Sequence, residues 1–338
     1  MIDCSKEIHN YHGEKVRLGE KQRGEMRQRR SANQNRVKTD LKNKGQPTPK
    51  RFVKQGSYAM HTMVQHPEND YDIDDGAIFD RDDLTGPQGG DISPRKARDI
   101  VRDAVNDGSF TTPPETLKNC VRVYYSGNYH VDIPVYREYE DDNGDTILEL
   151  ASSEWRNSDP TKLTEWFNNA VIDRSPDENN GRQMRRIVCL LKKFARSRSS
   201  WKLPSGLILS VLTDENYCPN DGRDDQALFD TMQAIYSRLV MSGHQVFNPV
   251  DGSEELTQGP DDSKMQELED RLKWALDKLR PAKNETCTKN EALKLWKEVF
   301  GKDDFFDQFI EEDEGKENKA VNTLVASAAT TSPRQWAG

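Results

Sequence analysis

Residues 55–76 read QGSYAMHTMVQHPENDYDIDDG and set a Gly-Ser turn upstream of two aspartates spaced one apart, Asp72 and Asp74. Tyr71 and Ile73 alternate with these aspartates. This alternation has the period of a β-strand, whose side chains point to opposite faces in turn. Both carboxylates therefore project from one face of the expected strand, where they either hold a metal ion or face water.

Further strands are predicted downstream. Residues 121–138 read VRVYYSGNYHVDIPVYRE, two β-rich runs joined by Ser-Gly-Asn, which is typical of a hairpin. A third run, TILELA at 146–151, is expected to extend the sheet. The second run carries Asp132 between Val131 and Ile133. An acid in a central strand is costly unless it finds a partner, so Asp132 is a further candidate ligand.

Three aspartates on neighbouring strands can converge on one ion. Mg²⁺ takes a few carboxylate oxygens and completes its shell with water and substrate phosphate. Gly56 and Ser57 offer backbone N–H groups and a hydroxyl to a phosphate, and glycine permits a close approach. With Asp72, Asp74 and Asp132 they predict a phosphoryl-transfer site that uses Mg²⁺, or Mn²⁺ in its place. A solvated strand face is the alternative for the Asp-x-Asp pair alone.

Helices are expected on both sides of these strands. Residues 17–44 lack proline and are rich in helix formers, which predicts one long helix lying across a surface. A basic arm for nucleic acid is the alternative. Ser93 before Pro94 is a strong helix start. Amphipathic helices are expected at 182–198 and 261–279.

The order Gly-Ser, Asp-x-Asp and a third Asp on a later strand resembles the polymerase β-like nucleotidyltransferases. The segments QGSYAMHT, DYDIDDG, HVDIPVYR and SDPTKLTEWF are similar to those of the bacterial CD-NTases, relatives of the cGAS and DncV enzymes that make cyclic oligonucleotide signals in anti-phage defence. The resemblance runs from Arg17 to Tyr217, and beyond this range only general helical character carries it.

This resemblance implies an α+β, bilobed polymerase β-like nucleotidyltransferase fold. Residues 1–170 would form the long spanning N-terminal helix and the catalytic lobe with a mixed sheet. Residues 171–310 would form a helical nucleotide-binding lobe, and residues 311–338 a flexible tail.

The resemblance also implies site roles. Asp72, Asp74 and Asp132 would be catalytic metal ligands for two-metal nucleotidyl transfer. Lys192 would hold the nucleotide triphosphate and Ser205 would be a second phosphate contact, although Gly206 stands where relatives often have a bulkier residue. A surface lysine is the alternative for Lys192.

The activity that the resemblance implies is the joining of NTPs, at least one with a purine, with release of pyrophosphate. The product would be a cyclic di- or trinucleotide second messenger that acts on a downstream effector. Two alternatives stay open. The chain could make linear oligonucleotides or adenylylate RNA or protein, or it could be an inactive nucleotide-binding module.

Composition favours a cytoplasmic protein without a membrane partner, because no run of ~18 apolar residues and no apolar signal segment occurs. The net charge of −9 argues against binding to a nucleic-acid backbone, so activation by nucleic acid is not expected. The five scattered cysteines argue against disulfides and structural zinc. The histidines show no ligand spacing, and HNYH at 9–12 is expected on exposed chain.

The C-terminal segment, residues 311–338, is acidic and then rich in Ala, Ser and Thr, which predicts a mobile tail. It ends in Gly338. Some anti-phage systems of the resembled family join the synthase through its C-terminal residue to a target by ubiquitin-like chemistry. The resemblance thus implies a ubiquitin-like ligase as a partner that acts on Gly338, and an ordinary frayed terminus is the alternative.

Overall fold

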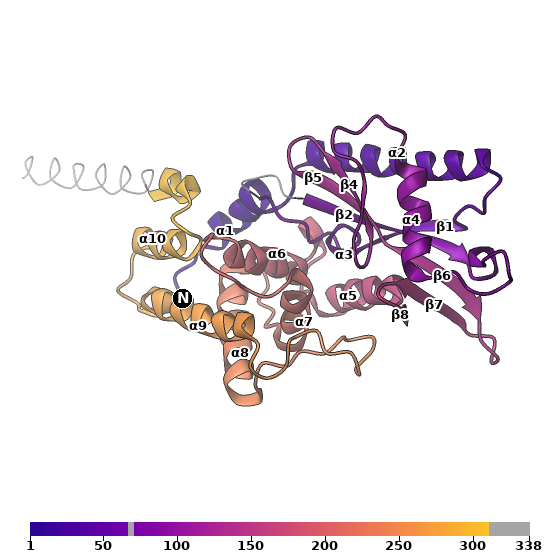
Figure 1. The fold of residues 1–338 in the computed structure, drawn as a ribbon. Helices are drawn as coiled ribbons and strands as arrows, with labels where there is room; N and C mark the ends of the chain where they lie inside the picture. The colour runs from indigo at the N-terminus through magenta and orange to yellow at the C-terminus, as the bar shows by residue number, and fades with distance from the viewer. Residues whose placement is uncertain (67–70, 311–338) are drawn as a thin grey trace, which may run out of the picture.

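The computed structural model describes residues 1–66 and 71–310, which form two lobes side by side (Figure 1). One lobe holds a sheet, and the other consists of helices. The predicted α+β, bilobed fold is therefore confirmed. Residues 311–338, with the predicted tail and Gly338, lie outside the described residues.

The described residues form an eight-stranded sheet. The strands are β1 Arg51–Gln55, β2 Tyr71–Asp80, β3 Glu115–Thr116, β4 Val121–Tyr125, β5 Tyr129–Ile133, β6 Val135–Glu140, β7 Thr146–Ala151 and β8 Trp155–Asn157. The predicted hairpin is β4 with the antiparallel β5, and the predicted third run is β7. The Asp-x-Asp pair lies at the start of β2, as the alternation predicts.

β2 lies at the centre of the sheet. It pairs antiparallel with β1 and parallel with both β5 and β6. β5 and β6 lie end to end along β2 because Pro134, which has no N–H to donate, interrupts the strand. The amide of Ala77 donates to the Pro134 carbonyl at 2.8 Å, so the chain stays against β2 through the break.

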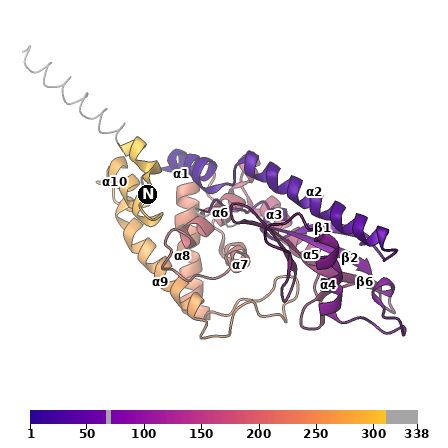
Figure 2. The same ribbon diagram turned by 45° about the horizontal axis from the view of Figure 1, so that its top comes forward.

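The helices divide between the lobes (Figure 2). They are α1 Ser5–Tyr11, α2 Glu20–Asn43, α3 Gly56–Ala59, α4 Pro94–Val105, α5 Pro160–Arg174, α6 Gln183–Ala195, α7 Gly206–Asn216, α8 Asp224–Ser242, α9 Ser263–Leu279 and α10 Lys289–Val299. Figure 2 shows α2 running along the sheet lobe, with its N-terminal end toward α1. None of the helices in the described ranges combines the length and apolarity needed to cross a bilayer.

α2 and α4 cover one face of the sheet. Val37 and Leu41 of α2 are fully buried in a cluster with Ala77 of β2. Arg30 donates from Nε to the buried Asp75 carboxylate at 2.6 Å. The predicted long helix is confirmed, and it buries one side against the sheet rather than merely lying across a surface. The opposite face of β2 carries Asp72 and Asp74.

The expectation that residues 9–12 lie on exposed chain is wrong. Tyr11 is fully buried and His12 is 5% exposed, because α1 packs against α8 in the helical lobe. The Tyr11 ring lies 4.7 Å from that of Phe300, centroid to centroid, and its hydroxyl donates to Asp303 at 3.0 Å. Burial lowers the pKa of His12 to about 3, so this side chain is neutral. Contacts between the two ends of the chain are not visible in the local sequence.

Candidate active site

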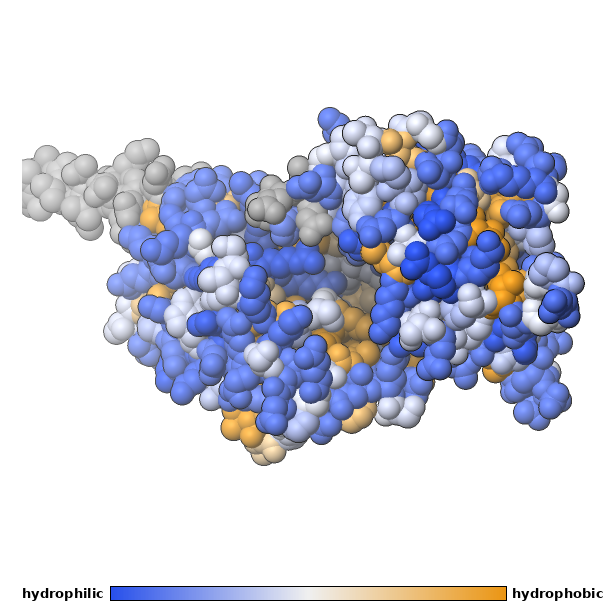
Figure 3. Space-filling view, in the orientation of Figure 1, coloured by the Kyte–Doolittle hydropathy of each residue, from blue (hydrophilic) through white to orange (hydrophobic). Residues whose placement is uncertain are grey.

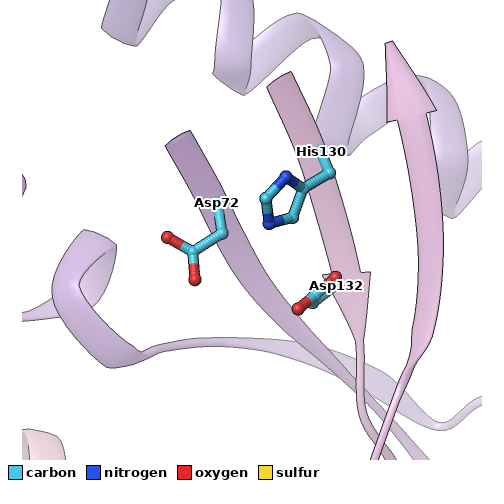
Figure 4. A group of neighbouring side chains, drawn as sticks. All are labelled: Asp72, His130 and Asp132. Carbon is cyan, nitrogen blue, oxygen red and sulfur yellow. The ribbon is translucent and has the colours of Figure 1, made fainter. Parts of the chain in front are cut away.

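The parallel pairing of β2 with β5 places four polar side chains on one face of the sheet. Asp72 is in register with His130, and Asp74 is in register with Asp132. Because side chains alternate along a strand, all four lie opposite the apolar residues that pack toward α2 and α4. Figure 4 shows the neighbouring side chains of Asp72, His130 and Asp132.

Asp72, His130 and Asp132 can hold a cation together. Each offers one ligand atom, and these atoms lie within 4.8 Å of one another. The expectation that no histidine has ligand spacing with the acids is therefore wrong for His130. A signal was present in the sequence, because His130 precedes Asp132 by two residues and so shares its strand face. Asp74 adjoins this group without belonging to it.

Arg122 of β4 binds both carboxylate oxygens of Asp132. Its Nε donates to Oδ1 at 2.8 Å and its Nη2 donates to Oδ2 at 2.7 Å. Asp132 is only 6% exposed, so this bidentate pair supplies the partner that an acid in a central strand needs. The sequence analysis missed Arg122, whose position opposite Asp132 depends on the hairpin register.

Asp74 has the most perturbed carboxyl group of the site. Its burial, and then the neighbouring Asp72 and Asp132 carboxylates, raise its pKa well above the usual range, and Arg122 offsets this only in part. Three carboxylates thus share a face with one arginine. This arrangement is short of positive charge, a condition that a divalent cation with oxygen ligands relieves.

Gly56 and Ser57 open the short helix α3, rather than forming the predicted turn. Gly56 has φ of 62°, in the left-handed region that favours glycine. A Cβ at this position would come within 2.2 Å of Oδ2 of Asp74. Glycine is therefore needed both for the backbone and for the place of the Asp74 carboxylate.

A cavity of about 210 Å³ lies between the lobes and opens beside the aspartates. Asp72 and Asp74 line it from the sheet lobe, and Lys192 and Arg196 of the α6 region line it from the helical lobe. The space-filling view is hollowed between the two lobes (Figure 3). Arg196 was not predicted from the sequence, and its side chain forms no hydrogen bond or ion pair among residues 1–66 and 71–310. The cavity thus has acidic residues on the wall from the sheet lobe and cationic residues on the wall from the helical lobe.

Lys192 is a buried lysine, so the surface alternative is wrong. Its side chain is 6% exposed, and Nζ donates to the carbonyl and to Oγ1 of Thr62, at 3.2 and 2.8 Å. Burial lowers its pKa from 10.5 to about 8. A Cβ at position 206 would come within 2.7 Å of Cε of Lys192, so a larger residue there would require the lysine side chain to shift. A contact to nucleotide phosphate stays a prediction.

Ser205 is the N-cap of α7, and its Oγ accepts from the amide of Ile208 at 3.4 Å. It lines an adjoining cavity of about 390 Å³ together with Lys192 and Arg196. It does not line the cavity that Asp72 and Asp74 share. The predicted nucleotide contacts of Gly56, Ser57, Lys192 and Ser205 therefore fall on two neighbouring cavities and stay predictions.

Known proteins resemble the chain in sequence. Residues 50–136 match the model of a family described as cyclic GMP-AMP synthase DncV-like, nucleotidyltransferase domain. A cyclic GMP-AMP synthase from Escherichia albertii is 26% identical over 217 residues, which cover 60% of this chain and 45% of that protein. The chain thus spans less than half of the length of this curated relative.

Solved structures resemble the fold. Vibrio cholerae DncV cyclic AMP-GMP synthase, in complex with the linear intermediate 5′ pppA(3′,5′)pG, is 18% identical with a TM-score of 0.70, covering 88% of this chain and 96% of its own. The CD-NTase CdnG of Bradyrhizobium diazoefficiens, in complex with GTP, is 16% identical with a TM-score of 0.68, covering 92% and 98%. CdnC of E. coli MS115-1, in a complex with HORMA-deltaN, is 18% identical with a TM-score of 0.63, covering 89% and 97%.

These structural likenesses establish the fold, and the sequence match lies on the strands that carry the three aspartates. The resemblance that the sequence motifs indicated is therefore confirmed. At residues 50–136 the chain is thus similar to the nucleotidyltransferase domain of the cyclic GMP-AMP synthase DncV-like family.

Proposed function

We propose that this chain joins NTPs with release of pyrophosphate and closes the product into a cyclic di- or trinucleotide. The observation that carries the proposal is the meeting of Asp72, Asp74 and Asp132 on one sheet face, across a cavity from Lys192. A buried lysine facing clustered acids fits a substrate that is itself a polyanion bound with a cation.

A divalent cation fits the residues present. Asp72, Asp132 and His130 bring ligand atoms within 4.8 Å of one another, and Asp74 stands beside them with an elevated pKa. Carboxylate oxygens favour hard ions, so we infer Mg²⁺, with Mn²⁺ as the substitute that tolerates His130. When bound, two such ions would lower the pKa of the attacking ribose hydroxyl and stabilise the leaving pyrophosphate.

The protein residues have separate tasks in this proposal. Arg122 fixes the plane of the Asp132 carboxylate through its two hydrogen bonds. Gly56 lets the chain approach Asp74 closely enough for a phosphate to lie against the α3 backbone. Lys192 and Arg196 attract the triphosphate from the opposite wall. Ring closure requires the linear intermediate to turn over in the same cavity for a second transfer.

The resemblance to relatives bound to nucleotides supports the substrate class. The solved DncV holds a linear intermediate with A and G, and CdnG holds GTP. We infer at least one purine nucleotide among the substrates here. A role in anti-phage defence through a downstream effector follows from the resemblance to CD-NTases and belongs to the same proposal.

One experiment tests the activity. Purified full-length protein is incubated with each labelled NTP and with all four, in Mg²⁺, and the products are treated with phosphatase. Phosphatase leaves a cyclic product unchanged, because it has no terminal phosphate. A product that phosphatase converts to a species without terminal phosphates would replace cyclisation by linear synthesis, and the absence of any product in Mg²⁺ or Mn²⁺ would indicate a binding module. Asp72→Asn protein serves as the blank.

For the C-terminus we propose that a ubiquitin-like ligase activates Gly338 and that the tail is dispensable for synthesis. Deletion of residues 330–338 should leave NTP turnover intact in the test tube. The same deletion should abolish any higher-mass conjugate in cells that encode the ligase. Conjugates that persist after the deletion would contradict attachment through Gly338.

A further inference from the structure

A second cavity, of about 230 Å³, lies between α6 and the start of α2, and we call it the basic cavity. Its ionisable lining includes arginines and histidines, and no Asp or Glu belongs to it among the described residues. The arginines are Arg17, Arg23, Arg185 and Arg186. The volume far exceeds the ~10–15 Å³ that one water needs. The cavity therefore has room for an organic molecule.

Two of the four arginines are paired with acids outside the cavity. Arg186 binds Asp224 and Asp177, at 2.6 and 2.7 Å. Arg23 pairs with Glu20 through one Nη, while its buried Nε has no hydrogen-bond partner within the described ranges. A buried donor without an acceptor costs free energy. A ligand that offers an acceptor to Nε of Arg23 would remove this cost.

Arg17 and Arg185 form no hydrogen bond or ion pair with an acid in the part of the chain that the structure describes. Arg185 donates only to neutral oxygens: the carbonyl of Met60 at 3.0 Å, the carbonyl of Gly181 at 2.7 Å and the amide of Asn168 at 2.9 Å. Burial lowers the pKa of Arg185, because the charged guanidinium is partly removed from water. The side chain of Arg17 makes no polar contact there at all. Two guanidinium groups at the cavity thus have no ion-pair partner among the described residues.

His61 lies close to the same positively charged side chains. Its partial burial and then the nearby Arg185, Arg23, Lys54 and Arg17 lower its pKa. Its backbone has φ of 55°, an uncommon conformation for a residue other than glycine. A neutral imidazole in this place can donate a hydrogen bond to an anion without adding to the repulsion.

The rest of the lining is apolar or aromatic, with Leu18, Tyr58 and Met63 on the wall. We propose that the basic cavity binds a small organic anion with at least two negative charges, held by Arg17, Arg23 and Arg185, and with an apolar body against this wall. Carboxylate and phosphate groups share the required chemistry, because arginine binds both through paired hydrogen bonds.

We call the cavity of about 210 Å³ beside Asp72 and Asp74 the catalytic cavity. The basic cavity is connected to it through residues 60–64. The Met60 carbonyl accepts from Arg185, and the carbonyl and hydroxyl of Thr62 accept from Lys192. Met63 lines both cavities. An anion that draws on Arg185 therefore acts on the segment that positions Lys192. Its binding should change the KM for NTPs rather than create a new reaction.

Binding is tested by calorimetry on the full chain without Mg²⁺, with phthalate as the dicarboxylate and phenyl phosphate as the phosphate ester. Arg17→Gln and Arg185→Gln should each weaken binding about tenfold, as expected for one lost charge-assisted hydrogen bond. Arg27→Gln is the matched control, because Arg27 lies one turn beyond Arg23 on α2, pairs with Glu20 and does not line the cavity. Lys192→Met reports on binding in the catalytic cavity instead.

The proposal is supported if either probe binds, and if its affinity falls with Arg17→Gln while Arg27→Gln and Lys192→Met retain it. The probe that binds more tightly identifies the acid group of the ligand. No binding by either probe, equal losses in Arg17→Gln and Arg27→Gln, or a loss confined to Lys192→Met would each overturn it. Arg17 lies on the surface, so this variant folds even if Arg185→Gln does not. The assay needs no turnover, so its outcome does not depend on the proposed synthase activity.

Discussion

The catalytic cavity and the basic cavity share α6 and residues 60–64 as a wall, yet their charges differ. The catalytic cavity sets the carboxylates of Asp72 and Asp74 against Lys192 and Arg196. The described lining of the basic cavity contains cations and no acid. The acids come from paired strands with a fixed register, whereas the basic cavity is built from helix ends and loops. The lining of the catalytic cavity therefore suits a cation bound together with a polyanion. The lining of the basic cavity suits an anion without a cation.

The comparison is tested most strongly by removing an acid from the catalytic cavity. Asp72→Asn should lower turnover about a thousandfold or more, the scale of losing one preorganised charge in an active site. The melting temperature should stay within a few degrees of the parent value, because Asp72 forms no ion pair within residues 1–66 and 71–310. Turnover and thermal unfolding are measured on the same preparation, with Asp83→Asn as the exposed-acid control.

Asp132→Asn should affect stability as well as turnover, unlike Asp72→Asn. It removes a charge from the bidentate pair with Arg122 and leaves a partly buried guanidinium without its anion. We expect both lost turnover and a lowered melting temperature. Undiminished turnover by Asp72→Asn or by Asp132→Asn would remove these residues from the site.

The next effect in size is expected at Gly56. Gly56→Ala places a methyl group where Oδ2 of Asp74 lies, 2.2 Å away, and displaces that carboxylate. A misplacement of this kind costs about a hundredfold in rate. Gly45→Ala is the matched control, since Gly45 also has a positive φ, of 64°, but meets nothing within 4 Å. Equal activity of the two variants would mean that the Asp74 position does not matter.

A smaller effect is expected from the cationic wall. Lys192→Ala removes charge without touching the acids, so the KM for NTPs should rise about tenfold while kcat falls less. Lys193→Ala is the control, because Lys193 lies only 4.0 Å from Asp303 on the other side of α6. Steady-state kinetics with each NTP check the result. An unchanged KM in Lys192→Ala would contradict a phosphate contact.

The smallest effect is expected from pH. Lys192 is charged below its pKa of about 8 and neutral above it, so kcat/KM should fall a few-fold as the pH rises through this value. Loss of folding does not explain such a fall. Because folding lowers this pKa from 10.5, the unfolded chain binds more protons between the two values, and the contribution of Lys192 to stability rises with pH there. The fall should be absent in Lys192→Met.

The local sequence predicted β2, the hairpin of β4 and β5, β7, the helix that follows Ser93, and the three aspartates, because alternation and capping are properties of neighbours along the chain. It did not predict Arg122 or the ligand position of His130, since both depend on which strands pair and in what register. The burial of Lys192 and of His12 was missed for the same reason. Their neighbours come from segments far away in the sequence.

The break at Pro134 has a consequence for how the sheet can open. It divides the hydrogen bonds along β2 into one ladder that carries Asp72 and Asp74 and another, at residues 77–80, that packs under α4. The two ladders are joined only by the Ala77 to Pro134 bond on this side of β2. Deuterium uptake by backbone amides should accordingly follow two rates. The end that carries Asp72 and Asp74 can then loosen and tighten while the other end keeps the lobe folded.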